Sequence, residues 1–299
     1  MQKQSSDRGL WLGLLGVTIF SITLPMTRLA VGDQTDPQLP PLFVTAGRAC
    51  CAAILSAIYL LATRAPMPPR RLYGDLLLAA LGVVIGYPLF LGFALRQVDS
   101  THAAVVTGLL PIGTAAFAAL MLKQRPSIGF WLAALLGCAL VVAFAALRGG
   151  GHLKPADGLL LLAIVSTSFG YVAGARAAAQ MRAEHVISWS LIVAMPITLP
   201  VAVLAWPAHG VTASAWTGFG YVAIFSSWLG FFAWYRGLAL GGTMRVSQVQ
   251  LLQPFFSLLF AVPILGEQLD AVTIVFAVAV IATVAISKRM PTHTGAIDN

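Results

Sequence analysis

Runs of about 20 predominantly apolar residues, a length that crosses a lipid bilayer as a helix, follow one another along nearly the whole chain. Charged residues make up only 9% of the 299 positions, too few to cover a water-soluble protein of this size. The 59% of hydrophobic residues exclude a disordered chain. The sequence therefore predicts an all-α integral membrane protein. Ten transmembrane helices are expected, at residues 9–31, 40–62, 73–94, 103–122, 127–147, 157–179, 185–206, 215–236, 245–265 and 271–287.

The basic side chains predict the orientation of these helices. Lys and Arg collect in cytoplasmic loops, and 13 of the 18 lie on the side that also holds both termini, against 4 on the other side. Both termini, including a tail at 289–299, are therefore expected in the cytoplasm. The net charge of +8 comes from these loops and implies no nucleic-acid partner. The first apolar run has no small-residue cleavage site and is interpreted as a retained helix rather than a signal peptide.

A glycine-rich linker loop at 149–156 divides the chain near its midpoint. A first five-helix repeat is expected at 1–148 and a second at 157–288. Because five is an odd number, the second copy would run through the membrane in the opposite sense. Two inverted repeats can exchange conformations and open a central site to either side, which favours a transporter that works by alternating access. The alternative is a duplication that only enlarged a stable helix bundle.

The similarity between the two halves is clearest around two prolines. A shift of 143 residues lays Pro111 on Pro254 and pairs Thr107 with Gln250. Each polar residue precedes its proline by four positions, so both lie on the same helix face as the proline. The sequence therefore predicts equivalent polar faces on the fourth and ninth helices.

The stretch LLQPFFSLLFAVPILGEQLDAVTIVFAVAVIATVAI (251–286) resembles the C-terminal part of the EamA family in the drug/metabolite transporter superfamily. The resemblance rests on Pro254, on the pair Gly266-Glu267 that closes the ninth helix, and on a final helix rich in small residues. It implies ten helices with cytoplasmic termini. It also implies a metabolite exporter of the inner membrane, with amino acids, including aromatic ones, as substrates.

The first half contains a weaker copy of this pattern. Pro111 is followed by Lys-Gln at 123–124, where the second half has its Gly-Glu pair. An arginine near the start of the second helix, here Arg48, is also common in the family. In the first helix, Phe-Ser at 20–21 replaces the Trp and small residue usual in the family.

Acidic residues are absent from the middle of the predicted helices. All ten Asp and Glu residues lie in loops or at helix ends. Proton-coupled pumps and small multidrug exporters usually hold a carboxylate within the membrane, so we expect an uncoupled carrier driven by the substrate gradient. No H-E-x-x-H, G-x-S-x-G or paired intramembrane carboxylates occur, which argues against an enzyme. A drug or cation exporter of the same superfamily and a passive solute channel are the alternatives.

Polar and aromatic side chains near mid-membrane are the candidates for substrate binding. Amides donate and accept hydrogen bonds, which suits a zwitterionic solute, and packing between helices is their alternative role. For Arg48, snorkelling or structural pairing competes with capture of a substrate carboxylate. For Trp228, stacking on the substrate competes with packing, whereas Trp234 is assigned to the interfacial aromatic belt. The predicted substrate-binding residues are Ser21, Arg48, Tyr87, Thr107, Ser168, Tyr171, Trp228, Ser247, Gln250 and Gln253.

Prolines within the predicted helices are the candidates for bend points, because each lacks an N–H and frees a backbone carbonyl. A static kink is the alternative reading for the first helix. The predicted gating or hinge residues are Pro25, Gly86, Pro88, Pro111 and Pro254.

The cysteines predict no disulfide, metal site or cofactor. Cys50, Cys51 and Cys138 lie in apolar runs without a CxxC motif or a paired His. We expect a multi-pass protein of the bacterial inner membrane, monomeric or homodimeric, whose partners are membrane lipid and a small-molecule substrate.

Overall fold

The computed structural model describes residues 2–121, 125–148, 150–241, 248–289 and 292–293, and helices fill most of these ranges. The elements of the first half are α1 (Gln2–Val31), α2 (Pro41–Ala62), the 3-10 turn η1 (Arg70–Leu72), α3 (Tyr73–Ala79), the π-helical turn η2 (Ala80–Gly86), α4 (Tyr87–Leu95), α5 (Ser100–Thr107), α6 (Leu110–Met121), β1 (Arg125–Pro126) and α7 (Ile128–Arg148). Those of the second half are α8 (Pro155–Ala178), α9 (Ala183–Leu204), α10 (Ala213–Tyr221), the π-helical turn η3 (Val222–Leu229), α11 (Gly230–Gly241), the 3-10 turn η4 (Gln248–Leu252), α13 (Gln253–Leu265), α14 (Ala271–Arg289) and β2 (Thr292–His293).

Helix overlaps every one of the ten predicted windows. Among the described residues, seven helical segments are long and apolar enough to cross a membrane: Arg8–Val31, Pro41–Ala62, Arg70–Leu95, Ser100–Met121, Ile128–Arg148, Pro155–Ala178 and Ala183–Leu204. The last three windows hold the helix from α10 through α11 and the shorter helices α13 and α14. That these three also cross the membrane stays a prediction.

Large apolar side chains are exposed over the outer surface of the bundle. Leu61, Ile128 and Leu204 are 79%, 81% and 86% exposed. Soluble proteins rarely expose extended apolar surface, whereas lipid tails are suitable neighbours for it. The exposed apolar surface and the long apolar helices together indicate a multi-pass membrane protein.

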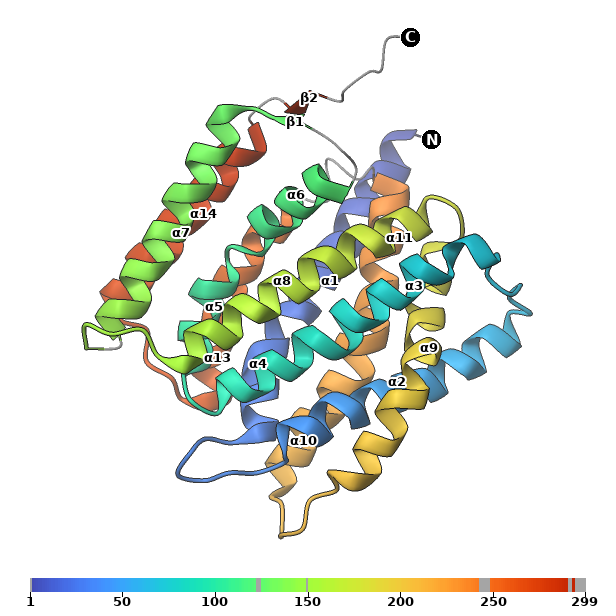
Figure 1. The fold of residues 1–299 in the computed structure, drawn as a ribbon, viewed down its shortest axis with the longest axis horizontal. Helices are drawn as coiled ribbons and strands as arrows, with labels where there is room; N and C mark the ends of the chain where they lie inside the picture. The colour runs from blue at the N-terminus through green and yellow to red at the C-terminus, as the bar shows by residue number, and fades with distance from the viewer. Residues whose placement is uncertain (1, 122–124, 149, 242–247, 290–291, 294–299) are drawn as a thin grey trace.

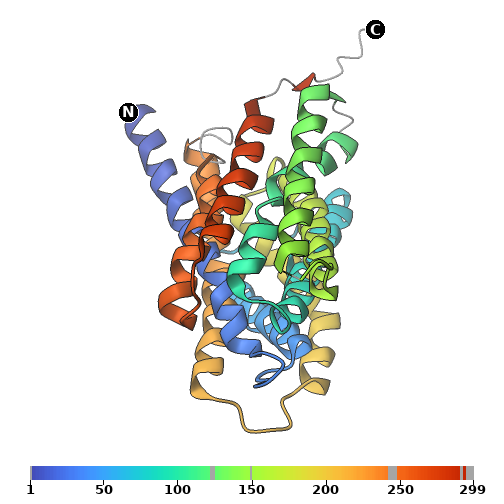
Figure 2. The same cartoon turned by 90° about the vertical axis from the view of Figure 1, so that its left-hand side faces the viewer.

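The helices pack in pairs that relate the two halves. α2 packs against α9, and α7 packs against α14 at one edge of the bundle (Figure 1). α1 packs against α11 and α13, and α8 packs in the same way against α4 and α6. The first helix of each half therefore contacts the third and fourth helical segments of the other half. α1 begins and α14 ends at the same end of the bundle (Figure 2), where β1 and β2 also pair. We name the opposite end of the bundle the distal end.

A wide helical turn recurs at equivalent positions of the two halves. A shift of 143 residues carries η2 onto η3. In the first half, Pro88 follows the turn, and its ring cannot fit above the carbonyl four residues earlier in a regular α-helix. In the second half, the Ser227 hydroxyl donates to the carbonyl of Val222, five residues earlier, at 2.9 Å. Such turns are rare in proteins, and those that occur often lie at functional sites.

Gly82 allows α8 to approach the π-helical turn η2 closely. A Cβ atom on Gly82 would lie 2.3 Å from the carbonyl oxygen of Ser166 and 2.8 Å from the Cα of Gly170. Both atoms belong to the backbone of α8, so neither can rotate away. Small residues at such crossings increase van der Waals contact between membrane helices.

We expect Gly82→Ala to destabilise the protein by about 1–3 kcal/mol, because the added methyl group forces the two helices apart. Thermal unfolding of the purified protein in detergent, followed by tryptophan fluorescence, measures this as a lower midpoint. Gly74→Ala in α3 is the matched control, since no atom lies within 4 Å of a Cβ there. An equal midpoint for both variants would contradict the close packing at Gly82.

Candidate functional site

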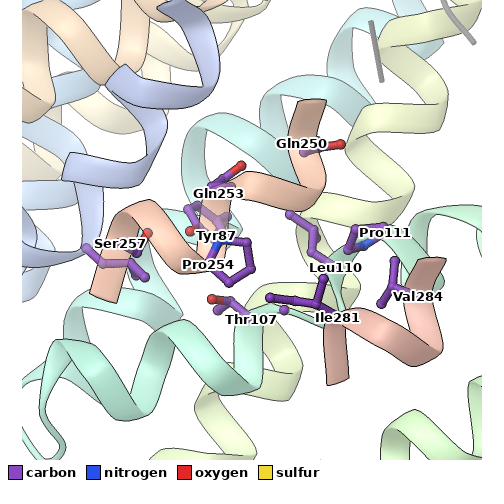
Figure 3. A pocket seen from close by; sticks show the side chains of 12 residues that line it. Tyr87, Thr107, Leu110, Pro111, Gln250, Gln253, Pro254, Ser257, Ile281 and Val284 are labelled. Carbon is purple, nitrogen blue, oxygen red and sulfur yellow. The ribbon is translucent and has the colours of Figure 1, made fainter. Parts of the chain in front are cut away.

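A first cavity lies between the segment formed by α5 and α6, the fourth of the chain, and the segment formed by η4 and α13, the ninth. It is bordered on one side by α14 (Figure 3). It contains about 460 Å³ of space free of protein atoms, counting the part that is open to solvent. Gln250, Gln253 and Ser257 border it from one segment and Thr107 from the other, and Tyr87 adds a further polar side chain. The cavity thus lies between one helix of each half.

Both helical segments are broken beside this cavity. α5 ends at Thr107 and α6 begins at Leu110, whereas the 3-10 turn η4 leads into α13 at Gln253. Under the shift of 143 residues, Leu110 corresponds to Gln253, so the two new helices begin at equivalent positions. A proline is the second residue of each, where its missing N–H leaves no bond unmade. The equivalent pairs that line the cavity are Thr107 with Gln250, Leu110 with Gln253, and Pro111 with Pro254.

A second cavity adjoins the first and shares the lining residues Tyr87, Leu110 and Gln253 with it. It contains about 560 Å³ of space free of protein atoms, counting the part that is open to solvent. Its apolar walls and its polar groups come from both halves. The apolar residues include Phe20, Val83, Val84, Ile187, Leu191 and Phe231, and the polar residues include Thr23, Arg48, Thr167, Tyr171, Ser226 and Ser227. Mostly apolar walls with a few convergent polar groups are typical of solute sites.

Arg48 extends into the bundle rather than toward either surface. Its side chain is buried, and its Nε donates to the Ser227 hydroxyl at 2.7 Å. Its Nη2 donates to the Ser226 hydroxyl at 2.9 Å. The snorkelling alternative is therefore wrong, and a structural pairing with η3 is observed.

Most of the predicted site residues border the two cavities. The residues that line at least one of them are Arg48, Tyr87, Pro88, Thr107, Pro111, Tyr171, Gln250, Gln253 and Pro254. Ser247 lies outside the described residues. The lining also includes residues of α9 and α14, from which the sequence analysis named no candidate.

Ser21 and Pro25 join α1 to α13 instead of lining a cavity. The missing N–H of Pro25 leaves the Ser21 carbonyl without its partner within the helix. The Ser257 hydroxyl of α13 donates to that carbonyl at 2.9 Å, and the Ser21 hydroxyl lies 3.2 Å from the carbonyl of Gln253. Pro25 therefore exposes an acceptor that holds the two helices together.

Three further predicted residues pack between helices. Gly86 and Ser168 lie where α8 packs against the first half. A Cβ on Gly86 would lie 2.8 Å from the side chain of Ser166, and a Cβ on Gly113 would lie 2.6 Å from Ser168 Oγ. The Trp228 ring contacts Tyr59 and Phe232. Trp234, which the sequence assigns to the interfacial belt, is 7% exposed because it packs against Gly16 of α1, so that assignment is wrong.

The partners of Arg48 are the main residues that sequence reasoning missed. Ser226 and Ser227 look like ordinary helix hydroxyls, which usually bond to their own backbone. The π-helical turn η3 brings both serines to Arg48, and the residue pattern of the second half does not predict that turn. Phe20 and Phe231 were also missed, because an aromatic residue in an apolar helix gives no signal of the cavity it borders.

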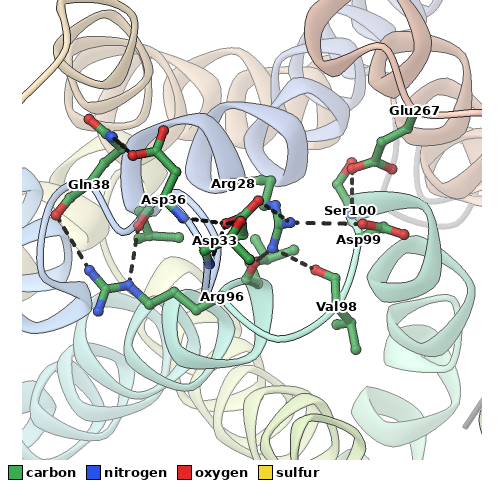
Figure 4. Close-up of polar contacts among 12 residues, drawn as sticks. Arg28, Asp33, Asp36, Gln38, Arg96, Val98, Asp99, Ser100 and Glu267 are labelled. Atoms are coloured by element: carbon green, nitrogen blue, oxygen red, sulfur yellow. Dashed lines mark hydrogen bonds and ion pairs between the residues drawn. The ribbon is translucent and has the colours of Figure 1, made fainter.

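Charged residues link several loops at the distal end (Figure 4). Arg28, in the last turn of α1, lies 3.5 Å from Asp33 and 3.9 Å from Asp99, and also donates to the carbonyls of Leu95 and Val98. Hydrogen bonds from Thr35 and the Asp36 backbone, with a smaller effect of Arg28, lower the pKa of Asp33 to about 2. Asp33 is therefore ionised at any physiological pH.

Glu267 connects the two halves at this distal end. Its carboxylate accepts the backbone N–H groups of Ser100 and Thr101, each at 2.8 Å (Figure 4). These are the first two N–H groups of α5, which have no partner inside the helix. Gly266, with φ of +68°, ends α13 in the left-handed conformation that turns Glu267 toward α5.

A buried contact between a histidine and a carboxylate lies away from both cavities. His102 Nε2 is 2.7 Å from Asp157 Oδ1, and each side chain is 8% exposed. Asp157 also accepts the backbone N–H of Lys154 at 2.8 Å, and so caps the first turn of α8. This carboxylate stabilises a helix start and does not line either cavity.

A helical membrane bundle of two related halves around a polar cavity has the architecture of a secondary transporter. The model of the EamA-like transporter family matches residues 7–145 and again residues 154–288, so the chain belongs to this family. It is 43% identical over 284 residues to "Uncharacterized transporter YdeK" of Bacillus subtilis (strain 168), covering 93% of this chain and 96% of the relative. A solved chain described as "Crystal structure of protein" has a TM-score of 0.63 at 18% identity, covers 94% of this chain and 98% of its own, and shows a shared fold.

We expect Ser257→Ala to destabilise the protein by about 1–2 kcal/mol, because the carbonyl freed by Pro25 then stays buried without a donor. The midpoint of thermal unfolding measures the change. Thr217→Ala is the control, since its hydroxyl is exposed and bonds only to its own helix, at Ala213, and its effect stays within about 0.5 kcal/mol. The role of this contact is refuted if both variants unfold at the wild-type temperature.

Proposed function

We propose that this transporter exports or exchanges amino acids and similar small metabolites across the bacterial inner membrane by alternating access. The observation that carries the proposal is the first cavity, which lies between two helices broken at equivalent residues of the two halves. Broken helices offer polar groups to a solute and can flex, and transporters commonly bind their solutes at such breaks. Pro111 and Pro254 are the proposed hinge residues, with Gly86 and Pro88 beside η2.

The proposed architecture is ten spans in two inverted five-helix repeats, 1–148 and 157–288, joined by the loop 149–156. Its support is the double match of the family model, the reciprocal packing of the helices and the recurrence of the π-helical turn. The excess of basic residues beside the termini supports a cytoplasmic location for both. The distal end then faces the periplasm.

The lining of the cavities supports amino acids as substrates. Gln250 and Gln253 can accept from an ammonium and donate to a carboxylate, Arg48 supplies a positive charge, and Phe20 and Phe231 form an apolar wall. Tyr87, Thr107 and Tyr171 complete the proposed binding set, whereas Ser21, Ser168 and Trp228 keep their packing roles. No Asp or Glu lines either cavity among the described residues, which supports transport without proton coupling.

Counterflow in proteoliposomes tests the proposal. Vesicles loaded with an unlabelled amino acid take up the same labelled amino acid in a saturable way, with or without a pH gradient. Gln253→Ala raises the half-saturating concentration about tenfold or more, because a hydrogen bond to a charged group is lost, whereas Gln268→Ala, an exposed amide in a distal loop, does not. Absence of exchange with every amino acid excludes this substrate class, and flux that fails to saturate indicates a channel.

A further inference from the structure

The buried guanidinium of Arg48 is only partly bonded. Nε and Nη2 donate to Ser227 and Ser226, but Nη1 is buried without a hydrogen-bond partner among the described residues. An arginine in a protein stays protonated, so the donors of Nη1 lose water without gaining an acceptor, which is unfavourable. Arg48 lines the second cavity, so an acceptor that enters this cavity can reach it.

Arg48 also lacks a counter-charge within the described part of the chain. The ion pairs found there use Arg28, Arg148 and Arg176 as the positive partner. Removing one partner of a buried ion pair is strongly destabilising, because it leaves a charge without compensation. The cavity therefore presents a positive charge that a bound anion would neutralise.

Three hydroxyls keep the guanidinium in this orientation. Ser227 donates to the Val222 carbonyl, and Ser226 receives a hydrogen bond from Thr23 at 2.9 Å. The two serine oxygens therefore accept from Arg48. Because both serines lie on the π-helical turn η3, they hold one edge of the guanidinium and leave Nη1 free. They are positioning residues for Arg48.

We propose that Arg48 Nη1 binds the carboxylate of the transported solute, and that the solute does not need an amino group. This inference rests on the proposed function and narrows its substrate class. Phe20, Phe231 and Leu191 provide an apolar wall for a hydrocarbon or aromatic group. Gln253 and Tyr171 offer hydrogen bonds, but no carboxylate among the described lining residues offers an ammonium a charge partner. The substrates are monocarboxylates with an apolar group, with or without an α-amino group.

Competition by analogues in the counterflow assay tests this inference on the wild-type protein. Uptake of labelled phenylalanine into phenylalanine-loaded vesicles is measured against 3-phenylpropionate, which lacks the amine, and phenethylamine, which lacks the carboxylate. We expect 3-phenylpropionate to compete within about tenfold of phenylalanine. Phenethylamine competes at least about 100-fold more weakly, because its charge faces Arg48.

Variants assign the effect to Arg48. Arg48→Gln abolishes saturable uptake of labelled phenylalanine and of labelled 3-phenylpropionate, because both solutes lose the bond to their carboxylate. Ser227→Ala weakens both uptakes in a correctly folded protein, whereas Arg182→Gln, an exposed arginine before α9, leaves them unchanged. Equal competition by phenethylamine and 3-phenylpropionate overturns the inference while phenylalanine exchange still supports the proposed function. If phenylalanine does not exchange, labelled 3-phenylpropionate is tested directly in vesicles loaded with it. Saturable exchange then supports the carboxylate site alone, and no exchange overturns both proposals.

Discussion

A helix inside a membrane must satisfy its backbone polar groups within the protein, and prolines within the helices, among them Pro25, Pro88, Pro111 and Pro254, prevent a regular helix from doing so. Pro25 frees the carbonyl of Ser21, which Ser257 then uses to bind α13 to α1. Pro88 follows a π-helical turn, and Pro111 and Pro254 stand at the start of new helices at equivalent positions. The cavities lie where these interruptions meet, so the departures from regular helix define the site.

The second π-helical turn gives the site its charge. It brings Ser226 and Ser227 to Arg48, which is thereby held in the interior although no described carboxylate neutralises it. The two cavities then differ in character but share Tyr87, Leu110 and Gln253. An amide-rich space between the broken helices adjoins a space with a positive charge and apolar walls, which suits a solute with a carboxylate at one end.

The sequence predicted the helical membrane bundle, the family and the equivalence of Pro111 and Pro254, because apolar length, family motifs and repeated polar positions are all visible in the residue order. It predicted Gln253 and Tyr87 at the cavity because polar side chains near mid-membrane are conspicuous in apolar helices. It did not predict the inward direction of Arg48 or its serine partners, since these depend on a wide helical turn that follows from tertiary packing. Trp234 was misplaced because burial against Gly16 depends on which helices touch. Glu267 was recognised only as part of a motif, and its bonds to the start of α5 explain why a carboxylate after glycine is useful there.

Alternating access requires that the cavity between the broken helices is reached from each side of the membrane in turn. A single cysteine at position 107, in a background where the three native cysteines are replaced, reports this through labelling by a membrane-impermeant maleimide in right-side-out and inside-out vesicles. Thr107→Cys fits because the native hydroxyl bonds only within its own helix. Labelling should be blocked by substrate, and Glu267→Ala, which removes the bond between the halves at the distal end, should increase labelling from the periplasmic side and decrease it from the cytoplasmic side. Labelling that rises from both sides together, or that substrate does not affect, would contradict alternating access at this cavity.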